Sequence, residues 1–121
     1  MTRFITHRKT EPWGSSVMLM ESEGKAFGRL YWYNGENVAY IEGLSVDTEF
    51  RNQGIGAKLL ENFEEIGRNL DMTTFCLRVT RKSWTHAWYK RLGYEDLHCD
   101  KNDESTIWMK KSLAIGGKHD A

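Results

Sequence analysis

VDTEFRNQGIGAKLL, residues 46–60, places an arginine and two closely spaced glycines between an apolar strand and an amphipathic helix. A helix that begins directly after a strand leaves its first backbone N–H groups without partners, and their dipoles concentrate positive potential at that end. Glycine at 54 and 56 removes Cβ atoms that would hold an anion away from these groups, and it permits the positive φ angles that turn successive amides toward one point. Arg51 adds a cation. The pattern predicts an anion cradle; a tight strand-to-helix turn without a ligand is the alternative.

Two common phosphate-binding motifs do not fit these residues. A G-x-G-x-x-G dinucleotide fingerprint would need a glycine where Leu59 stands. A Walker A loop would need Ser or Thr directly after Lys58, which is again Leu59. The anion that this turn accepts is therefore not expected to belong to either of those classes.

Length and composition restrict the function classes. The 121 residues suit one domain, and 17 basic and 17 acidic side chains cancel, so no global charge favours nucleic acid or an anionic membrane. The two cysteines, Cys76 and Cys99, show no metal-ligand spacing, and no signal-peptide pattern or long apolar run precedes them. We expect a cytoplasmic protein with free thiols, no metal and no nucleic-acid or membrane partner.

The rest of the chain shows alternating strand and helix signals. Runs rich in aromatic and β-branched residues between glycine-containing turns predict antiparallel strands. Apolar spacing from Gly56 to about Asn69 predicts an amphipathic helix whose other, solvated face carries Lys58, Glu61, Glu64, Glu65 and Arg68. Ser83 and Gly93 bracket a shorter helix. The expected strands cover residues 3–8, 17–22, 26–33, 38–46, 73–80, 94–99 and 105–111, with residues 9–16 a loop around the only proline. This order predicts an α/β (α+β mixed) domain, a mixed and mostly antiparallel sheet with helices packed on it, over residues 1–113, with a flexible tail at 114–121.

A resemblance to a known family rests on two segments. Arg51–Gly56, read as R-x-x-G-x-G between a strand and a helix, resembles the acetyl-CoA pyrophosphate motif of the GNAT superfamily of N-acetyltransferases. WYKRLGYED, residues 88–96, is similar to that family's FYEKLGF segment, and the resemblance covers roughly residues 17–112. It implies the GNAT fold, acetyl-CoA as cosubstrate, and transfer of an acetyl group to a primary amine by direct attack in a ternary complex.

The resemblance also implies a donor site. The amides of the glycine segment would hold the pyrophosphate, and the strand before it would splay from its neighbour and offer backbone groups to the pantetheine arm and the thioester carbonyl. Lys82 stands where family members often have an asparagine that contacts the pantetheine, so it would meet a CoA phosphate or be solvated. The expected donor-binding residues are Leu44, Ser45, Val46, Arg51, Asn52, Gln53, Gly54, Ile55, Gly56, Ala57, Lys58 and Lys82.

Two catalytic candidates follow from the same resemblance. Glu42 lies in EGLSV, which resembles a stretch of some aminoglycoside N-acetyltransferases, and it would be the general base; a solvent-facing glutamate is the alternative. Tyr40 lies on the same strand face, where other branches carry their glutamate, so the identity of the base stays open. Tyr89 matches the tyrosine that protonates the departing thiolate, or it is a core aromatic packed with Trp88 and Leu92, and both roles are compatible. An acetyl-enzyme on Cys76 or Cys99 is not expected.

The N-terminal part departs from the family pattern. GNAT members usually place two helices between their first two strands, whereas about ten loop-like residues separate Arg8 from Val17. The acceptor side would then be open to a large substrate or closed by another chain. Trp13, Trp32 and Trp84 are hard to bury together in so small a core, so we expect a homodimer. A catalytically silent CoA-binding or protein-interaction module is the alternative function, and the sequence does not select the amine acceptor.

Overall fold

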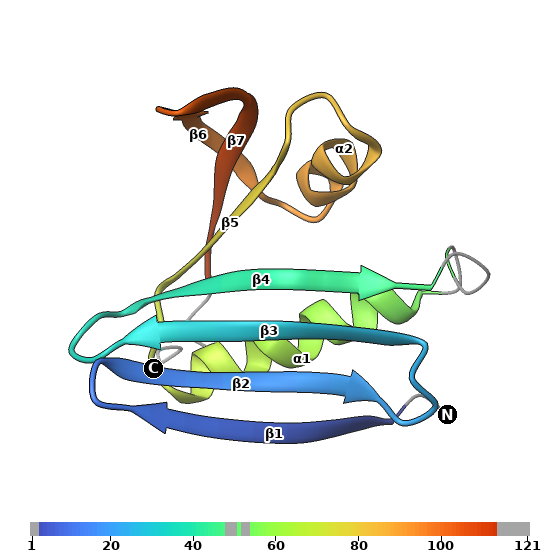
Figure 1. Cartoon of the computed structure of the whole chain (residues 1–121), viewed down its shortest axis with the longest axis vertical. Helices are drawn as coiled ribbons and strands as arrows, with labels where there is room; N and C mark the ends of the chain where they lie inside the picture. The colour runs from blue at the N-terminus through green and yellow to red at the C-terminus, as the bar shows by residue number, and fades with distance from the viewer. Residues whose placement is uncertain (1–2, 48–50, 52–53, 114–121) are drawn as a thin grey trace, which may run out of the picture.

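The structure is a computed structural model that describes residues 3–47, 51 and 54–113 (Figure 1). Its seven strands form one sheet in the order β1-β2-β3-β4-β5-β7-β6. The elements are β1 Phe4–Glu11, β2 Gly14–Glu21, β3 Ala26–Tyr33, β4 Val38–Val46, α1 Ile55–Asn69, β5 Thr74–Thr80, α2 Trp84–Arg91, β6 Glu95–Asp100 and β7 Asp103–Ser112. The predicted mixed, mostly antiparallel sheet with packed helices is confirmed. The predictions for Asn52, Gln53 and the tail at 114–121 lie outside the described residues.

The first hairpin is tighter than the sequence indicated. The loop predicted for residues 9–16 is wrong, because β1 runs to Glu11 and β2 begins at Gly14, with only Pro12 and Trp13 between them. Proline interrupts strand pairing only where its missing N–H is needed, and a turn does not need it. Gly14 lies against β3, where a Cβ would come within 2.1 Å of the Trp32 carbonyl oxygen. No helical segment therefore lies between these two strands.

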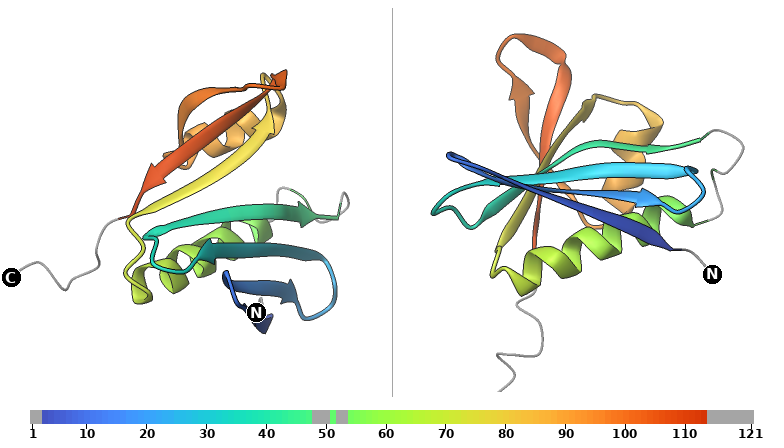
Figure 2. Two further views of the ribbon diagram at one scale, coloured as in Figure 1. Left: turned by 60° about the vertical axis from the view of Figure 1, so that its left-hand side comes forward. Right: turned by 60° about the horizontal axis from the view of Figure 1, so that its bottom comes forward.

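The sheet divides between β4 and β5. These parallel strands pair at only three positions, from Val38↔Thr74 to Tyr40↔Cys76, and then diverge (Figures 1 and 2). Beyond that point β4 stays paired with β3, across a bulge at Gly43, whose φ is 71°. β5 pairs on its other side with β7 along its whole length. The facing edges of β4 and β5 thus open into a wedge.

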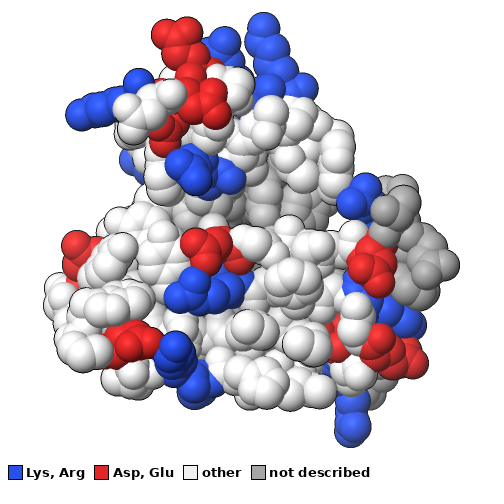
Figure 3. Space-filling model, in the orientation of Figure 1, with Lys and Arg blue, Asp and Glu red and all other residues white. Residues whose placement is uncertain are grey.

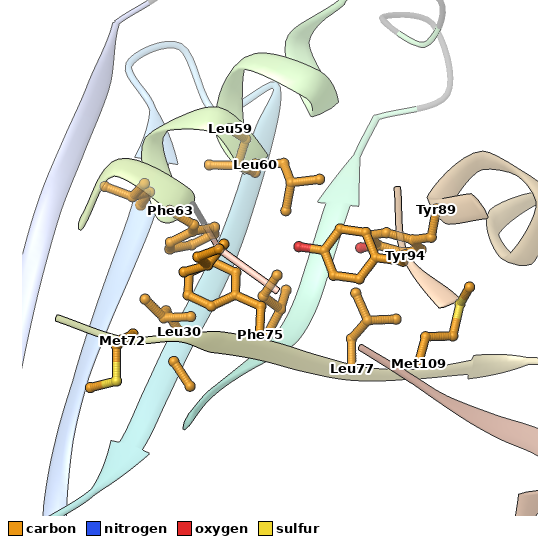
Figure 4. Close-up of a cluster of buried hydrophobic side chains, with 14 of the residues drawn as sticks. Leu30, Leu59, Leu60, Phe63, Met72, Phe75, Leu77, Tyr89, Tyr94 and Met109 are labelled. Carbon is orange, nitrogen blue, oxygen red and sulfur yellow. The ribbon is translucent and has the colours of Figure 1, made fainter. Parts of the chain in front are cut away.

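The core lies between α1 and one face of the sheet (Figure 4). Leu59, Leu60 and Phe63 of α1 are at most 3% exposed, as the helical spacing predicts. Gly67 lets the helix approach β5, because a Cβ there would lie 2.5 Å from the Phe75 ring. The structure thus explains why a glycine stands on the apolar face of this helix.

One prediction for α1 is wrong. Glu64 was expected on the solvated face with its charged neighbours, but it is 9% exposed. Its carboxylate lies 3.1 Å from Lys111 Nζ and accepts a hydrogen bond from the Tyr94 hydroxyl at 3.4 Å. Burying a carboxylate is tolerated when a cation and a hydrogen-bond donor compensate it. Glu64 therefore joins α1 to β7 and to the residue that precedes β6.

The opposite face of β1–β4 carries aromatic rings, and no helix of the described residues covers it (Figure 1). Side chains alternate between faces along a strand, so Tyr31, Tyr33 and Tyr40 point away from the buried Leu30, Ala39 and Ile41. Ring contacts at centroid distances of 5.1 to 6.5 Å link them to Trp13 at one end and Trp108 at the other. Figure 3 shows that uncharged residues cover most of this face, with adjoining acidic and basic side chains near its middle.

The three tryptophans expected to resist burial behave differently. Trp32 packs against the core, whereas Trp13 and Trp84 are 46% and 60% exposed. The expected homodimer stays a prediction. Neither α1 nor α2 combines the length and the apolar character that a membrane crossing requires.

Candidate functional site

A cavity of about 520 Å³ lies in the wedge between β4 and β5, closed at its sides by the start of α1 and by α2. The hollow between the two halves of the molecule is visible in Figure 3. The predicted site residues that line the cavity are Leu44, Ser45, Val46, Arg51, Gly54, Ile55, Gly56, Ala57 and Tyr89. The structure therefore brings together backbone from β4, the start of α1 and one face of α2.

The first turn of α1 offers unpaired amides to this cavity. Gly54 is the N-cap, and its φ of 79° lies in the left-handed region that glycine adopts without strain. The first backbone bond of the helix runs from the Lys58 N–H to the Gly54 carbonyl, 3.0 Å, so the N–H groups of residues 54–57 precede the bonded ladder. No residue in the described part of the chain accepts a hydrogen bond from them, and the first turn holds no acidic side chain. This end of the helix fits an anion such as a diphosphate.

The two glycines of the motif have different roles. Positive φ was expected at both, but only Gly54 has it, so the expectation for Gly56 is wrong. Gly56 is helical, and a Cβ there would lie 3.4 Å from both the Trp88 ring and the Val46 side chain. Its lack of a side chain therefore keeps the space between β4 and α2 open beside the free amides.

Arg51 is held at the mouth of the cavity by two contacts. Its Nε donates to the Val46 carbonyl at 3.2 Å, and its guanidinium carbon lies 5.2 Å from the centroid of the Trp84 ring. A guanidinium ion keeps its charge at any physiological pH. A permanent cation is thus fixed next to the α1 amides.

The end of β4 supplies backbone groups. Leu44, Ser45 and Val46 line the cavity on the edge that faces β5, where no pairing between the two strands exists beyond Tyr40. Unpaired N–H and C=O groups on such an edge can form hydrogen bonds with an extended polar ligand, in the way that they would pair with an additional strand.

Tyr89 reaches the cavity from α2. Its side chain is 6% exposed and contacts Trp88 and Tyr94 at ring-centroid distances of 4.9 and 5.3 Å. Figure 4 shows the Tyr89 and Tyr94 rings next to each other. Burial raises the pKa of the Tyr89 hydroxyl well above its usual range, so the group stays protonated at neutral pH. The neighbouring Tyr94 hydroxyl is engaged by Glu64, whereas the Tyr89 hydroxyl has no hydrogen-bond partner among the described residues. Tyr89 is thus a core aromatic that also lines the cavity, and its role as a proton donor stays a prediction.

Glu42 and Tyr40 do not line the cavity. Glu42 lies on the exposed sheet face, and its Oε1 accepts a hydrogen bond from Arg29 Nη1 at 2.6 Å. Tyr40 stacks on Tyr31, and partial burial raises the pKa of its hydroxyl. The assignment of Glu42 as the general base stays a prediction.

The two predicted lysines also lie outside the cavity lining. Lys58 directs its ammonium group toward Glu61, 3.8 Å away, and its N–H is used by the helix. Lys82 has a φ of 64° and donates its backbone N–H to His86 Nδ1 at 2.9 Å. Its backbone thus contributes to the start of α2, and its side chain is not part of the lining.

Several lining residues were missed by sequence reasoning. They are Ile41, Gly43, Leu77, Arg78, Val79, Thr80, Trp84, Thr85, Trp88 and Arg91. The spacing of Trp84 and Trp88, four residues apart after the Ser83 cap, does indicate one helix face. No comparable signal marks the β5 residues, because strand divergence depends on pairing partners far away in the sequence.

α2 is anchored by a histidine–aspartate contact. His86 is 7% exposed, and its Nε2 lies 2.7 Å from Asp96 Oδ1. Because Nδ1 accepts the Lys82 N–H, Nε2 carries the proton and donates to the carboxylate. Lys90 Nζ lies 3.2 Å from the other carboxylate oxygen. These contacts fix the helix that carries Trp84, Trp88 and Tyr89.

We expect this anchor to lose its effect in acid. The hydrogen bond from His86, then that from Lys90, lowers the pKa of Asp96 below its ordinary value. A carboxyl whose folded pKa is depressed stabilises the fold above its unfolded pKa, near 4, and this contribution is lost as pH falls through the folded pKa. Urea titrations between about pH 6 and about pH 3 measure the free energy of unfolding. This free energy should fall less with pH for Asp96→Asn than for the unmodified chain. Glu95→Gln is the matched control; an equal loss in both variants would contradict the anchor.

Comparisons with known proteins agree with this geometry. A family model described as an acetyltransferase (GNAT) domain matches residues 13–96. The fold is similar to that of the ribosomal-protein-S18-alanine N-acetyltransferase from Escherichia coli, with 18% identity, a TM-score of 0.67, and coverage of 91% of this chain and 76% of that one. A PaiA N-acetyltransferase from Thermoplasma acidophilum in complex with coenzyme A has 23% identity, a TM-score of 0.70 and coverage of 80% and 60%. An IAA acetyltransferase from Bacillus cereus has 15% identity, a TM-score of 0.70 and coverage of 92% and 100%. A search of curated protein sequences finds no match.

Proposed function

We propose that this chain, which belongs to the GNAT acetyltransferase family, transfers an acetyl group from acetyl-CoA to a primary amine by direct attack in a ternary complex. Family membership supports acyl transfer from an acyl-CoA in general. The observation that carries the finer proposal is the cavity in which free α1 amides, the unpaired β4 edge and the Tyr89 hydroxyl meet.

The cavity residues fit a coenzyme A donor from one end to the other. The amides of residues 54–57 and the Arg51 guanidinium offer hydrogen-bond donors and positive charge to a diphosphate. The edge of β4 between Leu44 and Val46 offers backbone partners to the amide groups of a pantetheine arm. Tyr89, which is 6% exposed, lines the same cavity and would lie near the thioester end of such an arm.

The proposed reaction needs two proton movements. The nitrogen of a neutral amine attacks the thioester carbonyl, the C–N bond forms, and the C–S bond breaks as the tetrahedral intermediate collapses. A base removes one proton from the nitrogen, and Tyr89 gives its proton to the departing thiolate. A backbone N–H of the β4 edge would stabilise the oxyanion, a contribution of about 3–4 kcal/mol in other enzymes.

Glu42 is the candidate base of this mechanism. Glu42 is held by Arg29, so it would have to release that ion pair or act through water to reach the amine. Glu42→Gln with unchanged turnover would remove it from the mechanism.

Two measurements test the proposal. Calorimetric titration with acetyl-CoA should show binding, and a thiol-release assay over monoamines, polyamines and a peptide with a free N-terminus should show turnover with at least one of them. Absence of acetyl-CoA binding would overturn the proposal. Binding without turnover on any amine would support a catalytically silent CoA-binding module instead.

A further inference from the structure

We propose that Trp84 is a stacking platform for the purine base of the donor nucleotide. The inference rests on the proposed function, since it assigns one residue to the adenosine end of coenzyme A. It is carried by the position of Trp84, its exposure and its contact with Arg51.

Trp84 lies beside the expected diphosphate site. It is the first residue of α2 and lines the mouth of the cavity. Trp88, four residues later, lies on the same helix side and close to Gly56. Both rings therefore face the start of α1, and the nucleoside attached to a diphosphate held there would emerge next to Trp84.

The exposure of Trp84 has no explanation in the packing of the fold. Its side chain is 60% exposed, the largest fraction among the exposed apolar side chains of the described residues, and it does not belong to the core cluster. An indole left in water at the mouth of a cavity offers a flat apolar surface to a ligand.

The contact with Arg51 holds the ring in place. The guanidinium carbon is 5.2 Å from the ring centroid, and the same side chain is fixed by the Val46 carbonyl. The cation occupies one face of the indole, so the other face remains for a base. A purine stacked there would complete a guanidinium–indole–purine stack and keep Arg51 near the phosphates. Stacking of a base on an aromatic side chain contributes about 5- to 150-fold to affinity.

Binding of donor fragments tests this assignment. Trp84→Ala should weaken the affinity for coenzyme A and for adenosine 3′,5′-bisphosphate by about 5- to 150-fold, and leave 4′-phosphopantetheine unchanged. Trp84→Phe should retain part of the affinity, because a phenyl ring still stacks. Nucleotide binding should quench tryptophan fluorescence in the unmodified chain and quench it less in Trp84→Ala.

Trp13→Ala is the matched control. Trp13 is 46% exposed and lies in the β1–β2 turn, outside the cavity lining, so its removal should change none of these affinities. Both tryptophans are largely exposed, so neither substitution should unfold the protein, and thermal denaturation verifies this. Unchanged binding of adenosine 3′,5′-bisphosphate to Trp84→Ala would overturn the inference, and so would an equal loss for 4′-phosphopantetheine. If the unmodified chain does not bind coenzyme A, the proposed function itself fails; if it binds and Trp84→Ala binds equally well, only the stacking role is lost.

Discussion

Tyr89→Phe should lower turnover by about 10²- to 10⁴-fold while leaving the affinity for acetyl-CoA within a few-fold of the unmodified value. The substitution removes only the hydroxyl, and the ring keeps its contacts with Trp88 and Tyr94. Because burial raises the pKa of Tyr89 far above neutrality, the phenol is protonated when the thiolate departs and can supply the proton. Without it the thiolate must leave unprotonated or take a proton from water. Steady-state thiol release and calorimetric acetyl-CoA binding measure the two quantities.

Tyr94→Phe is the control for this substitution. Its ring centroid lies 5.3 Å from that of Tyr89, its pKa is also raised by burial, and its hydroxyl donates to Glu64. Removing that hydroxyl should cost stability, about 1–3 kcal/mol for a buried hydrogen bond, with turnover retained. A Tyr89→Phe enzyme as active as Tyr94→Phe would exclude the hydroxyl from proton transfer. The expected pattern separates a role in chemistry from a role in the core, which the two tyrosines otherwise share.

The local elements of the fold are predictable from the sequence. Turn residues and two-residue alternation give β3 and β4 their bounds, and helical spacing with the Ser83 cap gives α1 and α2 to within two residues. These signals act between neighbours in the chain. The same local signals wrongly predict a loop at residues 9–16, because proline and glycine are common in loops and both occur there, at Pro12 and Gly14. In the structure, β1 pairs with β2 up to Glu11↔Gly14, and β2 also pairs with β3 from Gly14 on, so both strands extend to a two-residue turn.

Contacts between distant residues are what the sequence does not specify. Glu64 looks like a solvated helix residue until Lys111, 47 positions later, is placed beside it. The divergence of β4 from β5 was expected only by resemblance to a family, since nothing in either strand marks where their pairing stops. The anion site at α1 is the exception: a glycine N-cap after a strand defines it locally, and the structure shows free amides there among the residues it describes.

Gly54→Ala should weaken acetyl-CoA binding by about 10- to 150-fold. A hydrogen bond to a charged group contributes about 1.5–3 kcal/mol, and each 1.4 kcal/mol corresponds to tenfold in affinity. Gly54 has a φ of 79°, and a Cβ there would project into open space, with no atom of the described protein within 4 Å. That space is where a diphosphate would approach the α1 amides, so the methyl group displaces the ligand, and the strain it adds shifts the amides away from one another.

Gly35→Ala separates this effect from backbone strain. Gly35 lies in the β3–β4 turn, outside the cavity lining, with a φ of 82° and equally open space around its Cβ position. Both substitutions place an L side chain in the left-handed region, so each should cost about 1–2 kcal/mol of folding stability in urea titrations. Only Gly54→Ala should lose acetyl-CoA affinity. Gly54→Asn refines the test, because asparagine tolerates positive φ but its side chain still fills the space. This variant should be more stable than Gly54→Ala and should bind acetyl-CoA no more tightly. Equal acetyl-CoA affinity in the Gly54 and Gly35 variants would mean that the start of α1 does not hold the diphosphate, whatever else the cavity binds.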